Sequence, residues 1–195
     1  MNPRPWHARY GSIPTEIDAD AYPSVVAMLE AAMVTFADRP AFKCFGQTLS
    51  YADVDRLSRH FAAYLQSRLG VRKGDRIALM TPNLMAFPIA FLGIARAGAV
   101  QVNVNPLYTP RELAHQLRDA GAEILIVFNG VSATVADVLS TPDAPPLVKT
   151  VLTISPGDGT TAALPSPPVD ARLQGTVAFA QALSDGENLP FVPVP

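Results

Sequence analysis

The stretch RIALMTPNLMAFPIAFLGIARAGAVQVNVNPLYTPRELAHQLRDAGAEILIVF, residues 76–128, decides the fold of this 195-residue chain. Short apolar runs alternate in it with segments whose apolar residues recur at helical spacing, which predicts strands separated by helices. Strands joined by such crossovers form a parallel sheet with helices on its faces. The sequence therefore predicts an α/β fold with a Rossmann-like βαβ parallel sheet. The predicted strands are residues 76–80, 99–104, 123–128 and 147–154, and the predicted helices are about 84–96, 110–120 and 131–140.

The helix predicted at 110–120 has signals at both of its ends. Thr109 is the expected N-cap, Pro110 takes the first helical position, and Glu112 completes a capping box. Gly121 supplies the stop at the carboxyl end.

Upstream of this stretch the pattern predicts two more helices and a short antiparallel strand pair. The first helix covers about residues 25–36, where apolar residues lie on one helical face. AFKCF and TLS then flank Gly46 and Gln47, which predicts a hairpin. Ser50 is expected to cap the second helix, and Gly70 to end it.

Beyond residue 154 the sequence becomes rich in turn residues. SPGDGTTAALPSPPVDA, residues 155–171, is not expected to hold regular structure. A short helix is predicted at 173–184, and ENLPFVPVP at the end is predicted to be extended, with nothing in this chain to pack against. We therefore divide the chain into a lead (1–22), an α/β subdomain (23–154) and a loop-rich segment with one short helix (155–195).

Composition excludes several functional classes. The net charge of −2 provides no broad positive field, which argues against nucleic-acid binding. Residues 1–22 contain no apolar core of a secretory signal, and the longest apolar stretch, 84–95, is shorter than the ~20 residues of a membrane span. The single cysteine, Cys44, fits a reducing compartment, so a cytoplasmic location is expected. Charged residues make up only 16% of the chain, below the usual ~25%, so part of the surface is expected not to face water.

The loops at the carboxyl ends of the predicted strands are the first candidates for a binding site, because open parallel sheets bind ligands there. They are Thr81-Pro82-Asn83, Asn105-Pro106-Leu107-Tyr108 and Asn129-Gly130, and none contains a known catalytic or phosphate-binding motif. Asn105 and Tyr108 are polar groups that can line a ligand channel. Asn before Pro is also ordinary turn chemistry, so both interpretations stay open.

Other chemistry-bearing residues favour structural roles. Cys44 alternates with apolar neighbours and has no base nearby, which indicates a packed thiol. His60 and His115 lie singly beside the apolar stripes of helices. GDGTTA at 157–162 matches the dinucleotide-binding pattern, but the three prolines that follow oppose the helix which that site requires.

Residues 49–127 resemble the N-terminal part of adenylate-forming enzymes, specifically bacterial long-chain fatty-acid-CoA ligases. LSYADV at 49–54 is similar to the first core motif of that family, and LGIARAGAVQVNVNPLYTPREL at 92–113 to the second in its fatty-acyl-ligase form. Residues 8–37 resemble the start of the same subfamily. The expected fold is therefore the first subdomain of the adenylate-forming ligase fold.

The resemblance implies activation of a fatty acid by ATP and Mg, followed by transfer of the acyl group to CoA. The family's Ser/Thr/Gly-rich loop with its Lys has no counterpart in this sequence, because SPGDGTTAAL lacks the Lys. The chain is thus expected to be an N-terminal fragment that forms no acyl-CoA alone, holds no cofactor or metal, and contains no catalytic residue. Some relatives hold CoA phosphate with a basic residue where this chain has Leu107. Asn105, Tyr108 and Arg111 are the remaining candidates for a substrate or CoA channel.

Two other functions stay open at this point. A Rossmann-like nucleotide-dependent oxidoreductase would use the sheet but needs a Gly-rich turn. A non-catalytic dimerisation module would use an apolar surface of an unfinished sheet. The resemblance also implies a homodimer and peripheral contact with the inner membrane leaflet, from which insoluble fatty acids arrive.

Overall fold

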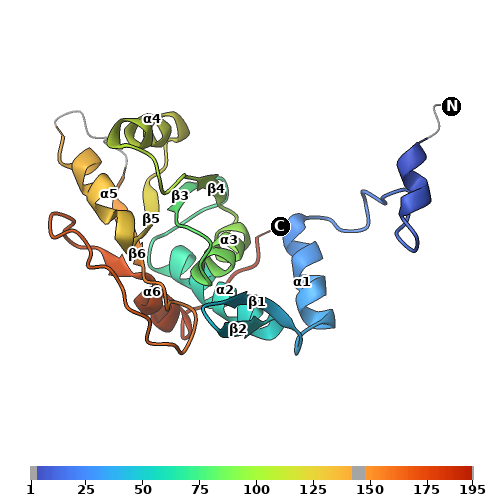
Figure 1. Cartoon of the computed structure of the whole chain (residues 1–195). Coiled ribbons are helices and arrows are strands. Elements are labelled where there is room, and N and C mark those ends of the chain that lie inside the picture. Colours follow the sequence, from blue (N-terminus) through green and yellow to red (C-terminus); the bar gives the residue numbers. More distant parts are fainter. Residues whose placement is uncertain (1–3, 142–147, 195) are drawn as a thin grey trace.

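The computed structural model of the protein describes residues 4–141 and 148–194 and has an α/β fold (Figure 1). At its centre is a five-stranded parallel sheet with the strand order β4-β3-β5-β6-β7. The predicted parallel sheet is confirmed, and four of its strands lie close to their predicted bounds. The strand predicted at 147–154 begins at a residue that lies outside the described part of the chain. The strands are β3 (Arg76–Met80), β4 (Val100–Asn103), β5 (Ile124–Phe128), β6 (Thr150–Ile154) and β7 (Val177–Ala178).

Helices cover both faces of this sheet (Figure 1). Side chains of successive strand residues point to opposite faces, so Ile77 and Leu79 pack into one core and Ala78 and Met80 into the other. The first core is closed by α2 (Tyr51–Ser67), α3 (Ala86–Arg96) and α6 (Phe179–Gly186), and the second by α4 (Pro110–Ala120) and α5 (Ser132–Leu139).

The predicted N-terminal helix and antiparallel strand pair are also present. They are α1 (Val25–Thr35), β1 (Pro40–Cys44) and β2 (Gln47–Ser50). The turn differs by one residue from the prediction, because Phe45 and Gly46 form it with φ of 49° and 73° and Gln47 already belongs to β2. A two-residue hairpin turn with two positive φ angles matches the twist of the strands. Ahead of α1, a 3-10 turn (Pro5–Arg9) lies in an arm that extends away from the body (Figure 1).

The predicted caps hold the helices in place. Thr109 accepts a hydrogen bond from the Glu112 amide at 3.4 Å, and the Glu112 carboxylate accepts one from the Thr109 amide at 2.8 Å. Gly121 has a φ of 64°, the left-handed conformation of a C-cap. Ser50 and Asp53 form the same reciprocal box at the start of α2, with both bonds 3.1 Å long.

Helix α2 lies at the centre of the helical layer and contacts α1, α3 and α6. Phe61 of α2 packs edge-on against Phe179 of α6, with ring centroids 4.7 Å apart. On the α3 side a Cβ at Gly93 would stand 2.7 Å from the Phe61 ring, so a residue without a side chain is required at this crossing. The sequence analysis did not identify this function of Gly93.

Arg96 at the end of α3 forms a buried polar hub, which the sequence analysis did not predict. Its guanidinium is fully buried and bonds to the Asp55 carbonyl at 2.7 Å and to Glu30 at 3.0 Å. It also contacts the hydroxyl of Ser58 and the carboxylate of Asp55. The hub thereby joins α1, α2 and α3.

The C-terminal segment departs from the prediction in two ways. The short helix, α6, begins at Phe179 rather than residue 173, because Gly175 takes a positive φ of 68° and the chain then adds β7 to the sheet edge. The final segment does pack within the chain. Val192 exchanges two hydrogen bonds with the side chain of Gln66, at 2.8 and 3.0 Å, and Phe191 lies against the apolar core. Residues 126 positions apart meet here, which no local pattern reveals.

Candidate functional site

The carboxyl edge of the sheet is the candidate site. The chain passes from β3 to β4 on one side and then returns to β5 on the other side of β3. Open α/β sheets bind ligands beside such a reversal, at the carboxyl ends of the strands. The predicted loops at residues 81–83, 105–108 and 129–130 follow β3, β4 and β5, and therefore lie along this edge.

Asn105 and Tyr108 belong to one tight turn after β4. The Asn105 side-chain oxygen accepts a hydrogen bond from the Leu107 amide at 2.9 Å, and the Asn105 carbonyl accepts one from the Tyr108 amide at 3.1 Å. Tyr108 is half-buried against the core below α4. The turn chemistry expected of Asn before Pro is present, and a role in a ligand channel stays a prediction.

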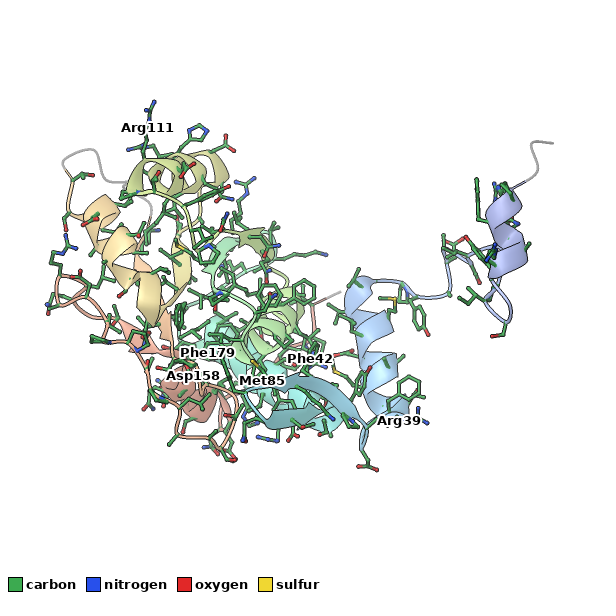
Figure 2. All side chains as sticks on the ribbon, viewed as in Figure 1. Arg39, Phe42, Met85, Arg111, Asp158 and Phe179 are labelled. Carbon is green, nitrogen blue, oxygen red and sulfur yellow. The ribbon has the colours of Figure 1, made fainter. Side chains whose placement is uncertain are left out.

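Arg111 lies in the first turn of α4 and points away from the sheet (Figure 2). It borders a shallow surface pocket together with His115 and Arg118. No contact given by the structure brings the Arg111 guanidinium to Asn105 or Tyr108. The three residues therefore share one loop and helix start without forming one cluster.

The sequence analysis named Asn129-Gly130 as a candidate loop, but it did not predict the polar cluster that Asn129 forms at the ends of β5 and β6. The buried Asn129 amide donates to the hydroxyls of Ser155 and Ser166, both at 3.0 Å. Its side-chain oxygen is buried and accepts no hydrogen bond within the described part of the chain. An Asn directly after the buried strand ILIVF was the available signal, but its partners lie 26 and 37 residues away.

Asp158 lies in the loop after β6, close to this cluster in sequence and structure. Its carboxylate accepts a hydrogen bond from the Ser155 amide at 2.9 Å. Burial raises the pKa of Asp158 above its ordinary value, and the Ser155 amide offsets part of that effect. A Cβ at Gly159 would stand 2.4 Å from Ile89 of α3, so this loop packs tightly onto the helical layer.

The histidines and the cysteine occupy separate places. Burial, then the nearby Arg56, lowers the pKa of His60, whose carbonyl lies against Gly186 of α6. His115 is exposed on α4. The half-buried Cys44 thiol lies 3.8 Å from the Asn83 carbonyl.

Two kinds of site considered from the sequence are a metal centre and a dinucleotide-binding turn. Within 4–141 and 148–194, no group of three His, Cys, Asp or Glu side chains could hold a metal ion. The GDGTTA segment forms turns rather than the start of a helix, so it does not form a dinucleotide site. The oxidoreductase alternative therefore has no support from this motif.

Comparison with known proteins assigns the fold to a family. The sequence profile of the family described as AMP-binding enzyme matches residues 29–184. The chain belongs to the AMP-binding enzyme family. The resemblance to adenylate-forming ligases that the two core motifs indicate is thereby confirmed.

Several proteins that are similar to this chain are named as CoA ligases or a CoA synthetase. The long-chain-fatty-acid–CoA ligase of Escherichia coli O6:H1 is 49% identical over 135 residues, which are 69% of this chain and 24% of that protein. The fatty acyl CoA synthetase of Mycobacterium tuberculosis has a TM-score of 0.61 and 26% identity over 66% of this chain and 26% of that chain. An anthranilate CoA ligase, AuaEII, in complex with anthranoyl-AMP has a TM-score of 0.70 at 22% identity, over 88% and 29% of the two chains, and supports the fold alone.

The chain spans about a quarter of the length of the curated relatives it matches. Its sheet and flanking helices thus match one portion of those relatives. No helix in the described part of the chain has the length and apolar character needed to cross a membrane.

Proposed function

We propose that this chain provides the N-terminal part of an ATP-dependent fatty-acid–CoA ligase. The observation that carries the proposal is the 49% identity to a long-chain-fatty-acid–CoA ligase over 135 residues. In this reaction the fatty-acid carboxylate attacks the α-phosphate of ATP, which releases pyrophosphate and leaves an acyl-adenylate. The thiol of CoA then attacks the acyl carbon and AMP departs. Mg supplies neutralisation of the phosphate charge, and its ligands would lie outside the described residues.

Within this proposal, Asn105, Tyr108 and Arg111 are the candidates for a substrate or CoA channel. The two hydrogen bonds of the Asn105 turn fix the backbone that carries Tyr108. Arg111 is exposed, and its guanidinium suits a phosphate group such as those of CoA. Their position after β4, at the edge where α/β sheets bind ligands, supports this assignment.

The proposal also covers the cofactors, the cellular location and the oligomeric state of the enzyme. ATP, Mg and CoA belong to the full-length ligase, and the fatty acid is its substrate. We place the ligase in the cytoplasm, in peripheral contact with the inner leaflet of the membrane. We also propose that it forms a homodimer. Exposed apolar side chains on α1 and the arm, among them Val34 and Ile17, support the homodimer.

A chimeric enzyme tests the ligase proposal. Residues 29–184 replace the matching segment of the Escherichia coli relative, and acyl-CoA formation from hexadecanoate, ATP, Mg and CoA is measured. We expect the chimera to form acyl-CoA and the 195-residue chain alone to form none. A chimera that melts like its parent yet forms no acyl-CoA would contradict the proposal. Acyl-CoA formation by the chain alone would contradict its assignment as a part of the ligase that is inactive on its own.

A further inference from the structure

A polar pocket lies at the amino edge of the sheet, opposite the carboxyl edge that carries the candidate site. All five strands run parallel, so their first residues lie together along this edge. The pocket has a volume of about 290 Å³, several times the ~30 Å³ that one water molecule occupies in the liquid. Its lining residues come from the turn after α2, the start of β3, the turn between α4 and β5, and the start of β6. A small molecule bound here would contact the amino ends of three neighbouring strands.

Arg76, the first residue of β3, lies on the wall of this pocket. Its Nη1 atom is 3.7 Å from the position that a Cβ on Gly121 would take, which places the guanidinium beside the turn between α4 and β5. Within residues 4–141 and 148–194, no side chain or carbonyl accepts a hydrogen bond from this guanidinium or forms an ion pair with it. A guanidinium presents its donors as a planar fork that matches two oxygens of one anion. Arg76 therefore offers this fork to a ligand.

Lys149 brings a second cation to the pocket, directly before β6. Its Nζ atom donates to Oε2 of Glu123 at 2.8 Å, and both residues line the pocket. An ammonium group has three N–H donors, so Lys149 can keep this ion pair and still donate to an anion. The ion pair holds the ammonium group on the wall of the pocket. Arg76 and Lys149 thus border the same polar recess from two different strands.

The segment that leads from α2 into β3 forms one side of the pocket and is basic. It contains Arg68, Arg72, Lys73 and Arg76 against one acidic residue, Asp75. The Asp75 carboxylate already accepts a hydrogen bond from the Arg72 amide at 2.8 Å. A phosphate monoester carries about −1.5 to −2 charges at pH 7, whereas a carboxylate carries one. The positive segment therefore attracts a phosphate group more strongly than a carboxylate.

Backbone rather than side chains forms another part of the wall. A Cβ at Gly70 or at Gly74 would meet no heavy atom within 4 Å, so open space lies in front of both residues. A ligand can approach the backbone closely where no side chain projects. The pocket thus has room for an organic group beside its two cations.

We propose that this pocket binds a small organic phosphate, with the phosphate group between Arg76 and Lys149 and the organic group over the backbone of Gly70 and Gly74. The guanidinium fork can hold two phosphate oxygens and the ammonium group the third. The site lies at the opposite edge of the sheet from residues 105–111, so it is separate from the proposed substrate or CoA channel. The proposal does not depend on the ligase function.

Isothermal titration calorimetry of the 195-residue chain with glycerol 3-phosphate tests the proposal, at constant ionic strength and without ATP, Mg or CoA. We expect one binding event with a dissociation constant of about 1 mM or lower, and a melting temperature that rises with the ligand. Glycerol should not bind, because it lacks the charge. No binding heat and no rise in melting temperature at about 10 mM glycerol 3-phosphate would overturn the proposal.

Inorganic phosphate separates the two parts of the proposed ligand. It has the phosphate group without the organic group, so it should bind in the same pocket but more weakly than glycerol 3-phosphate. Equal affinity for the two compounds would overturn the placement of the organic group over the glycine backbone.

Matched charge variants separate the pocket from general attraction to the basic segment. Arg76→Met should weaken binding of glycerol 3-phosphate by about tenfold, because the phosphate loses its charged hydrogen bonds. Lys149→Met should weaken it as well. Arg72→Met is the control, since it removes the same charge from the same segment but does not alter a residue that lines the pocket, and its effect should stay within about twofold. Thermal unfolding without ligand shows that each variant is folded.

The comparison of Arg76→Met with Arg72→Met decides the result. Equal weakening by both variants would show attraction to the basic segment as a whole and would overturn the pocket. Because the titration contains no ATP or CoA and no variant changes residues 105–111, such a failure leaves the chimera test of the ligase function unaffected.

Discussion

Substitution of Arg96 is expected to lower the stability of the fold strongly. Its fully buried guanidinium holds Glu30 and Asp55, and both carboxylates retain some exposure. We expect Arg96→Met to lower the free energy of unfolding by roughly 3 kcal/mol, because two carboxylates lose their buried partner. Arg59→Met is the control, since the exposed Arg59 pairs with the same carboxylates and should cost less than about 1 kcal/mol. Urea unfolding of both variants measures the difference, and equal losses would contradict the assignment of the hub to Arg96.

Arg96 also affects how the stability of the helical layer depends on pH, because it lowers the pKa of Asp55. Burial raises the pKa of Asp55, but the hydrogen bond and charge of Arg96, followed by those of Arg59, outweigh it and lower the pKa overall. A carboxyl group whose pKa is lowered by folding adds stability above its unfolded pKa, and this stability is lost as the pH falls through its folded pKa. The hub should therefore weaken below about pH 4.

Asp158 is expected to have the opposite pH dependence. Burial raises its pKa in the folded chain, so its contribution to stability is greatest in acid and is lost as the pH rises through the folded pKa. Asp158→Asn keeps an oxygen that can accept from the Ser155 amide and removes the charge. We expect this variant to be more stable than the wild type at pH 7, with a gain that shrinks toward pH 3. Thermal unfolding across this range measures the gain, and a gain that grows in acid would contradict the burial of this carboxyl group.

At the scale of elements, the cap of α4 is the clearest case for a test. Thr109→Ala removes the oxygen that accepts the Glu112 amide and should destabilise the protein by about 1 kcal/mol. The amide and then the hydroxyl of Thr109 lower the pKa of Glu112, so the variant should shift that pKa toward its ordinary value. Thr109→Ser retains the cap and is the control. NMR titration of the Glu112 carboxyl, with urea unfolding, measures both effects; an unchanged pKa in Thr109→Ala would contradict the capping box.

The elements predicted correctly are those whose signals are local. The capping box at Thr109 and the alternation of apolar runs with helical segments follow from residues a few positions apart. Strand β7 is two residues long and exists through pairing with β6, and Val192 finds its partner 126 residues away. Propensity cannot reveal such contacts, which is why the end of the chain was wrongly predicted to pack against nothing.

The residues of the candidate site also divide into those that a local sequence signal reveals and those that only tertiary contacts reveal. The loop of Asn105 and Tyr108 was located because a strand end can be recognised in the sequence. The partners of Asn129 come from a loop that the sequence predicts only as irregular. Arg96 interrupts an apolar run and would be expected in water, but three helices enclose it. Sequence therefore locates the edge of the sheet on which the site lies, and tertiary contacts determine the polar clusters.

At the scale of the whole molecule, the arm before α1 concentrates exposed apolar surface. The Ile17 side chain is 91% exposed, and Trp6 and Ile13 are exposed on the same arm. The arm's own hydrogen bonds include the ion pair of Arg4 with Glu16 at 3.3 Å, which gives it local structure in the extended position (Figure 1). Burial of one large apolar side chain contributes about 1.5–3 kcal/mol, so a few such contacts between two copies can offset part of the cost of association.

The proposed homodimer should therefore depend on this arm. Sedimentation velocity of the 195-residue chain over a range of micromolar concentrations should reveal a dimer, and removal of residues 1–22 should shift it to monomer. Ile13→Ser with Ile17→Ser should weaken the dimer while leaving the arm in place, because only apolar contact is lost. Val100→Ser at the sheet edge, which is exposed far from the arm in sequence, is the control and should leave association unchanged. If Val100→Ser alone abolished association, the dimer would form through the edge of the sheet, and the arm would have no part in it.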